Sequence, residues 1–107
     1  MISGLEKLLG TPRDGALLRY SLGLEYRKVG APEKALEHLN EAVRRDPLYS
    51  AAWKALGQVL SELDRTAEAL AAYRQGIEAA GKKGDRQAQK EMTVFARRLE
   101  KKLGAAP

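Results

Sequence analysis

Few residues of this sequence have side chains that suit catalysis or metal binding. The 107-residue chain has one histidine, His38, and no cysteine. A zinc site would therefore need carboxylates at every other position, and no nucleophile or second ligand accompanies His38, which we expect to be solvated. The stretch 81–84, Gly-Lys-Lys-Gly, lacks the spacing of a phosphate-binding loop and a preceding strand. We predict no catalytic residue, no metal site, no cofactor and no enzymatic activity.

The basic residues are a second candidate for binding chemistry, because they are unevenly distributed. Residues 1–81 contain eleven bases and eleven acids, whereas residues 82–103 contain eight bases and three acids, which accounts for the formal net charge of +5. The first interpretation is a solvated helix face whose bases suit the C-terminal end of the helix dipole. The alternative is an anionic partner such as nucleic acid, bound by Arg86, Lys90, Arg97, Arg98, Lys101 and Lys102.

Length and composition indicate one small domain in residues 1–107. Apolar residues make up 44% and charged residues 31% of the chain, which is typical of a globular or helical-repeat protein. The first nine residues have no basic segment followed by a long apolar run, so we expect no signal peptide. No apolar stretch reaches the ~20 residues of a transmembrane helix. We expect a cytoplasmic protein with no membrane insertion.

Apolar residues recur at helical intervals along the whole chain, which predicts an all-α fold. We expect a short helix in residues 1–10, two helices in 11–46, two in 47–81 and a last helix over 85–103. A break is expected at 79–84, and residues 105–107 should fray. The expected N-caps are Thr11, Asp46, Thr66 and Asp85, of which the first two precede a proline.

Four residues return after 34 positions, and this repeat organises the helices into pairs. Leu22-Gly23 and Ala35-Leu36 recur as Leu56-Gly57 and Ala69-Leu70. Such a period with helical spacing inside it means stacked helix pairs, because one pair cannot bury its apolar face alone. The glycines and alanines should let the two helices of a pair approach closely.

Around these positions the sequence resembles the tetratricopeptide repeat (TPR) family. The second unit contains Trp53…Leu56-Gly57 and Ala69…Tyr73, and the first contains Leu22-Gly23…Tyr26 and Pro47, at the spacing of that family's pattern. Arg19 replaces the first tryptophan, and the period fails after residue 83. The resemblance implies a right-handed α-solenoid of antiparallel helix pairs: two repeats and a capping helix over 85–103 with a polar outer face.

The resemblance also implies a function, since TPR arrays generally bind peptides or protein segments on a concave face lined by the first helix of each pair. We therefore expect a non-catalytic interaction module, an adaptor or scaffold. The residues Tyr20, Leu24 and Gln58 do not match the family's clamp for a C-terminal carboxylate, so we predict none. The positions implied to face the groove are Leu17, Tyr20, Leu24, Arg27, Lys54, Gln58 and Ser61.

Two further possibilities concern the ends of the chain. The N-terminal helix, with Ile2, Leu5, Leu8 and Leu9 on one side, could itself lie in the groove. The last helix could pair with its copy by burying Phe95 and Leu99 between chains, so we expect a monomer or a weak homodimer.

Overall fold

Six α-helices make up the computed structural model, which describes residues 1–104. No strand occurs in these residues, as the sequence predicted, and no helix among them is long and apolar enough to cross a bilayer. The expected fraying at 105–107 lies outside the described part of the chain. The helices are α1 (Ile2–Glu6), α2 (Ala16–Lys28), α3 (Pro32–Arg45), α4 (Ser50–Glu62), α5 (Thr66–Lys83) and α6 (Arg86–Gly104).

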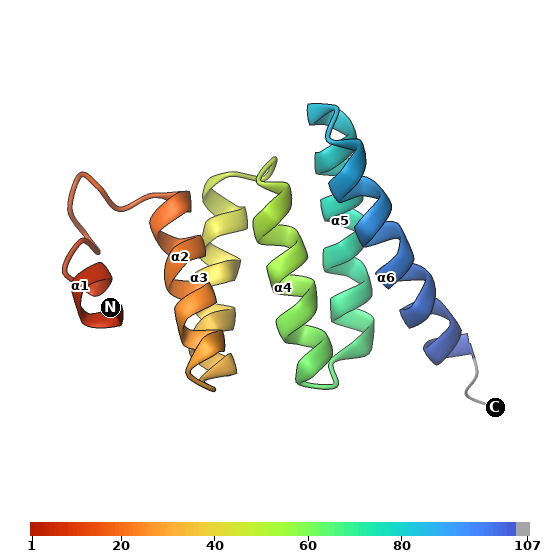
Figure 1. Ribbon diagram of the computed structural model, residues 1–107, viewed down its shortest axis with the longest axis horizontal. Coiled ribbons are helices and arrows are strands. Elements are labelled where there is room, and N and C mark those ends of the chain that lie inside the picture. Colours follow the sequence, from red (N-terminus) through yellow and green to blue (C-terminus); the bar gives the residue numbers. More distant parts are fainter. Residues whose placement is uncertain (105–107) are drawn as a thin grey trace.

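The helices form two layers in an elongated stack (Figure 1). Helices α2, α4 and α6 stand side by side in one layer, and α3 and α5 lie behind them. Helices α2 and α3 form one pair, α4 and α5 form the next, and α6 packs on α5 and α4. The resulting body measures 47 × 31 × 18 Å. This is the arrangement that the 34-residue period predicted.

The core runs along the stack between the two layers. Its largest fully buried side chains, each under 2% exposed, are Leu22, Leu39, Val59 and Met92. They come from four different helices, α2, α3, α4 and α6, so one core is shared along the whole stack. Burial of such apolar side chains contributes roughly 1.5–3 kcal/mol each, which favours the stack over separate helices.

The repeated glycines lie where the paired helices come closest, as predicted. A methyl group added at Gly23 would meet the Leu39 side chain at 2.5 Å, and one added at Gly57 would meet the Tyr73 ring at 2.6 Å. Gly76 is also required by packing, because a methyl group there would overlap the sulfur of Met92. The large residue opposite each glycine occupies the space that a side chain would need.

Two predicted helix starts are wrong by several residues. Helix α2 begins at Ala16 rather than after Thr11, and α4 begins at Ser50 rather than after Asp46. Thr11 donates to the Leu8 carbonyl and accepts the Arg13 N–H in the turn after α1. Asp46 accepts the N–H of Leu48, which closes a short side-chain turn. Both residues cap turns rather than helices.

The boundaries of α5 and α6 also refine the prediction. Thr66 is the first residue of α5, and the N-cap is Arg65. The break between helices was expected at 79–84 but begins only at Gly84, because α5 continues to Lys83. Gly84 follows it with a φ of 72°. A left-handed φ at this position favours glycine. Asp85 caps α6 as predicted, since its Oδ1 accepts the Ala88 N–H at 3.1 Å.

Helix α1 closes the N-terminal end of the stack and does not lie across α2 and α4 (Figure 1). The Tyr26 hydroxyl donates to Glu6 Oε2 at 2.7 Å. The apolar residues of this segment are half-buried against the core. The hypothesis that it occupies the groove is therefore wrong.

Candidate protein-interaction surface

Helices α2, α4 and α6 present one continuous surface, which we call the first-helix face. Two ion pairs join neighbouring helices of this layer: Arg27 Nη2 lies 2.7 Å from Glu62 Oε2, and Lys54 Nζ lies 3.3 Å from Glu91 Oε1. The hydrogen bonds from Arg27 lower the pKa of Glu62. Arg27 and Lys54, both implied to face the groove, are therefore engaged within the chain.

The apolar part of the first-helix face lies on α2. Leu17, Tyr20 and Leu24 share one side of this helix because they are spaced by three and four residues. Leu17 is 68% exposed, and the other two are half-buried at the edge of the core. Together these three apolar side chains, one exposed and two half-buried, form a surface that an apolar partner can bury.

Tyr49 extends this apolar part, and the sequence did not reveal it. Its ring centroid lies 5.0 Å from that of Tyr20, with the planes tilted by 44°. The residue belongs to the turn before α4, outside any helical stripe. Only the fold brings it to Tyr20, from 29 residues away.

The α4 part of the face is polar. Gln58 and Ser61 are half-buried, and they follow Lys54, which pairs with Glu91, by four and seven residues on the same side of α4. Their amide and hydroxyl groups can donate and accept hydrogen bonds without a charge to desolvate. The seven predicted groove residues thus lie on α2 and α4, with the apolar ones on α2 and the polar ones mostly on α4.

A polar network replaces the tryptophan that the first repeat lacks. Arg19 forms a two-pronged pair with Asp14, at 2.9 and 3.0 Å. Asp14 also accepts the Gly10 N–H at 3.0 Å, and Arg45 approaches it at 3.5 Å. The Arg19 bond, followed by the Gly10 bond, holds the pKa of Asp14 well below its usual range.

The same network reaches α3 through Glu41. This carboxylate accepts from Arg44 and Arg45, and the two hydrogen bonds, Arg44's first, lower its pKa to about 2. At the position equivalent to Arg19 in the second repeat, Trp53 instead packs against α5, and its indole N–H donates to the Pro47 carbonyl at 2.8 Å. The same repeat position therefore carries a charged side chain, Arg19, in the first repeat and an aromatic one, Trp53, in the second.

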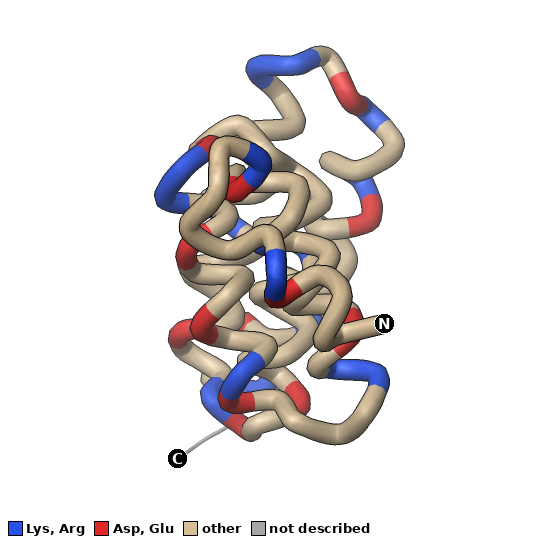
Figure 2. The backbone as a smooth tube through the Cα atoms, turned by 90° about the vertical axis from the view of Figure 1, so that its left-hand side faces the viewer, with Lys and Arg blue, Asp and Glu red and all other residues tan. Residues whose placement is uncertain are grey.

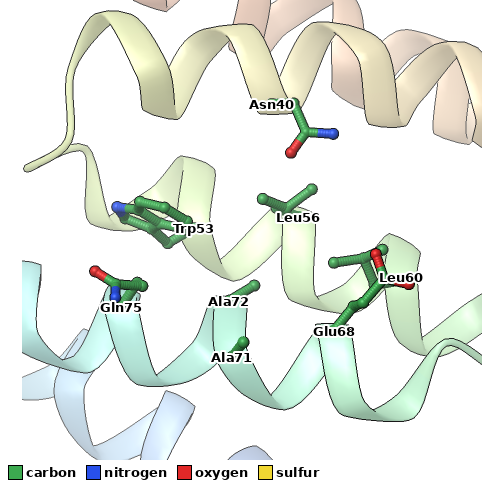
Figure 3. A pocket seen from close by; sticks show the side chains of 8 residues that line it. All are labelled: Asn40, Trp53, Leu56, Leu60, Glu68, Ala71, Ala72 and Gln75. Carbon is green, nitrogen blue, oxygen red and sulfur yellow. The ribbon is translucent and has the colours of Figure 1, made fainter.

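A shallow groove of about 270 Å³ lies on the opposite side of α4, between α3 and α5 (Figure 3). Its floor residues Leu56 and Leu60 are only 4% and 6% exposed. A ligand here would therefore gain little apolar contact from them, in contrast to Leu17. The lining residues are Asn40, Trp53, Leu56, Leu60, Glu68, Ala71, Ala72 and Gln75.

The basic residues of α6 fall into two groups. Arg86, Lys90, Arg97 and Lys101 form no ion pair with any side chain in residues 1–104. Lys102, by contrast, pairs with Asp64 at 2.9 Å, and Arg98 lies 5.9 Å from the centre of the Phe95 ring. The six predicted anion-binding residues therefore do not act as one set.

His38 is half-buried, so the expectation that it is solvated is wrong. Its ring stacks on Tyr26 at 5.5 Å, and its buried Nδ1 has no hydrogen-bond partner. Burial, followed by the charge of Arg19, lowers the pKa of His38. No group of three metal-ligating side chains occurs in residues 1–104.

Phe95 and Leu99 pack inside the chain. The Phe95 ring lies 5.4 Å from that of Tyr73, and Leu99 is 8% exposed. A homodimer that buries Leu99 between chains would first have to open the core, whereas Phe95 is only partly buried.

Comparison with known proteins agrees with this architecture. A family model described as tetratricopeptide repeat matches residues 20–83. The TPR repeat-containing protein PA0015 of Pseudomonas aeruginosa is 48% identical over 101 residues, which cover 94% of this chain and 96% of that protein. The chain therefore belongs to the tetratricopeptide repeat family.

Solved structures support the same assignment. The solution structure of protein BPP2914 from Bordetella parapertussis matches with a TM-score of 0.82 at 39% identity, over 99% of this chain and 92% of that one. The Sgt2 TPR domain from Aspergillus fumigatus matches with a TM-score of 0.75 at 27% identity, over 99% and 71% of the respective chains. The predicted TPR-type α-solenoid is confirmed.

Proposed function

We propose that this protein is a non-catalytic interaction module that binds a peptide or protein segment on its first-helix face. The observation that carries the proposal is an apolar group on α2 that consists of the exposed Leu17 and the half-buried Tyr20 and Leu24, extended by the half-buried Tyr49. Apolar and aromatic anchors of this kind contribute most of the binding energy in protein interfaces.

The distribution of side chains defines the kind of segment that fits. Apolar anchors would pack on α2, and the neighbouring backbone would find hydrogen-bonding groups at Gln58 and Ser61 on α4. Arg27 and Lys54 contribute rigidity, because their ion pairs hold the three first helices together. A preorganised face loses less entropy when it binds.

Peptide selection provides the test. A random peptide library displayed on phage is selected against the wild-type protein, and the dissociation constants of the selected peptides are measured by titration calorimetry. We expect Tyr20→Ala/Leu24→Ala to weaken binding by roughly 30-fold or more, the effect of losing about 2 kcal/mol at an interface anchor. Circular dichroism verifies that the variant remains helical.

A matched pair of exposed apolar residues tests whether binding depends on where a side chain lies or only on its hydrophobicity. Leu17 and Val29 are 68% and 62% exposed, but only Leu17 lies on the side of α2 shared with Tyr20 and Leu24. Leu17→Ala should weaken binding and Val29→Ala should not. Selected peptides that bind the Tyr20→Ala/Leu24→Ala variant as tightly as the wild type would refute the proposal.

A further inference from the structure

Four bases of α6 that form no ion pair within residues 1–104 lie in a single row, which the proposed peptide-binding residues on α2 and α4 do not explain. Arg86, Lys90, Arg97 and Lys101 are separated by four, seven and four residues, a spacing that places them along one side of a helix. The row spans about 22 Å, since each residue advances a helix by about 1.5 Å. All four side chains are exposed. We call this row the α6 basic stripe.

The other charged residues of α6 show which sides of the helix are already occupied. Glu91 pairs with Lys54 of α4, and Glu100 pairs with Arg74 of α5 at 3.4 Å. Met92, Ala96 and Leu99 face the core. With about 100° between successive residues, the centre of the stripe lies roughly opposite Met92 and Leu99. It therefore faces away from the stack.

This outward side can be compared with the sides by which the earlier first helices contact later helices of the chain. Arg27 of α2 reaches forward to α4, and Lys54 of α4 reaches forward to α6. In those helices, Gly23 and Gly57 allow the close approach of the second helix of the same pair, at Leu39 of α3 and Tyr73 of α5. The outward side of α6 carries no such glycine and includes Lys90, Thr93 and Arg97. An apolar helix of the kind found in this stack would bury these charges without partners, at a large cost.

The two ends of the stack differ in charge. Acidic and basic residues are interspersed along the chain when it is viewed from the end that α1 covers (Figure 2). At the other end, the stripe presents four bases without an acid partner among residues 1–104. Complementary charge, rather than an apolar contact alone, therefore determines what can lie along α6.

We propose that the α6 basic stripe binds an acidic α-helix of a partner protein, which lies along α6 where a further unit would stack. A helix with Asp or Glu at the same intervals of four, seven and four residues would place one carboxylate opposite each base. Val94, which is 47% exposed and lies between Lys90 and Arg97 in sequence, provides an apolar contact at the middle of the row. Attraction between the two charged rows would also accelerate association.

A helix fits the stripe better than a nucleic acid does. Single-stranded nucleic acids are usually held by aromatic side chains that stack on bases as well as by cations. The aromatic residue of α6, Phe95, is turned inward against Tyr73 at 5.4 Å, and the stripe itself contains none. The bases also form one row on a protruding helix rather than the two sides of a channel.

Binding of a synthetic helix tests the proposal. The probe is a fluorescent, alanine-rich 18-residue peptide with glutamates at positions 1, 5, 12 and 16, and the control peptide has the same composition with the glutamates redistributed around the helix. Fluorescence anisotropy at 20 and 150 mM NaCl gives the affinities. A 20-nucleotide single-stranded RNA and a 20-base-pair DNA duplex are measured in parallel.

Two protein variants carry the same loss of charge at different places. Arg97→Gln/Lys101→Gln should weaken binding of the patterned peptide about tenfold, from the loss of two surface ion pairs. Lys82→Gln/Lys83→Gln, at the end of α5, should change it less than twofold. Arg86→Gln/Lys90→Gln offers a second stripe variant if the first is poorly folded. Equal losses in the stripe and control variants would overturn the proposal.

The remaining outcomes are equally decisive. Tighter binding of the patterned than of the redistributed peptide, weakened at 150 mM NaCl, supports the proposal. Equal affinity for the two peptides, no binding at 20 mM NaCl, or tighter binding of RNA or DNA would each overturn it.

Discussion

The two helix pairs are alike inside and different outside. Four packing positions carry the same residue in both pairs, 34 residues apart: Leu22 and Leu56, Gly23 and Gly57, Ala35 and Ala69, Leu36 and Leu70. On the first-helix face the equivalent positions all differ: Leu17 and Ala51, Tyr20 and Lys54, Leu24 and Gln58, Arg27 and Ser61. Packing restricts which side chains fit, whereas exposed positions are free to differ. Binding specificity should therefore reside where the two pairs differ, and mainly on α2, where the exposed side chains are apolar.

The largest expected difference in stability is between Trp53 and Arg19, which hold equivalent positions. Trp53→Ala should lower the free energy of unfolding by about 3 kcal/mol, the lower end of the range for such truncations because the ring is only half-buried. Arg19→Ala should lower it by less, since Asp14 keeps Arg45 at 3.5 Å and the Gly10 N–H as partners. Urea denaturation measures both. A larger loss for Arg19→Ala would show that the first repeat depends on its polar network more than the second depends on its aromatic ring.

The paired glycines should differ next, because different side chains face them. Gly57→Ala should cost about 1–3 kcal/mol, since the added methyl group meets the rigid ring of Tyr73. Gly23→Ala should cost less, because Leu39 can change rotamer. Gly4→Ala is the control, with no atom within 4 Å of the added carbon. Thermal unfolding measures all three, and an unchanged midpoint for Gly57→Ala would contradict the close packing.

The polar network of the first repeat should make the free energy of unfolding depend on pH in acid, and this effect should be smaller than those of the substitutions above. The folded chain lowers the pKa of Glu41 from 4.5 to about 2, so its pairing contributes stability above pH 4.5 that is lost as the pH falls towards 2. The second repeat has Gln75 at the equivalent position. Glu41→Gln should therefore flatten the fall in unfolding free energy between pH 4.5 and 2. Glu78→Gln, which removes an exposed pair with Lys82 at 3.5 Å, serves as control, and an equal flattening would contradict the assignment.

The features that could be predicted from the sequence depend on local spacing. The helix pairs, the close approaches at Gly23 and Gly57 and the side shared by Tyr20 and Leu24 all follow from residues within one or two helices. The starts of α2 and α4 could not be predicted in the same way. Thr11 is a capping residue before proline, but the turn that uses it is held by Asp14 and Arg45, 31 residues apart.

The details of the binding surfaces also depend on long-range contacts. Tyr49 reaches Tyr20 only through the stacking of two units. Similarly, Lys102 is removed from the set of free bases by Asp64, 38 residues away. Sequence spacing identifies which residues share a helix side, and only tertiary packing shows which of them are already paired.

The most direct test of the binding face is a nuclear magnetic resonance titration. A selected peptide is added to the isotopically labelled protein, and the amide shift changes are mapped along the chain. We predict that the largest changes fall on α2 and α4 around Tyr20, Leu24 and Gln58. Changes concentrated around Asn40, Ala71 and Gln75, in the groove between α3 and α5, would contradict the claim that the first-helix face binds the partner.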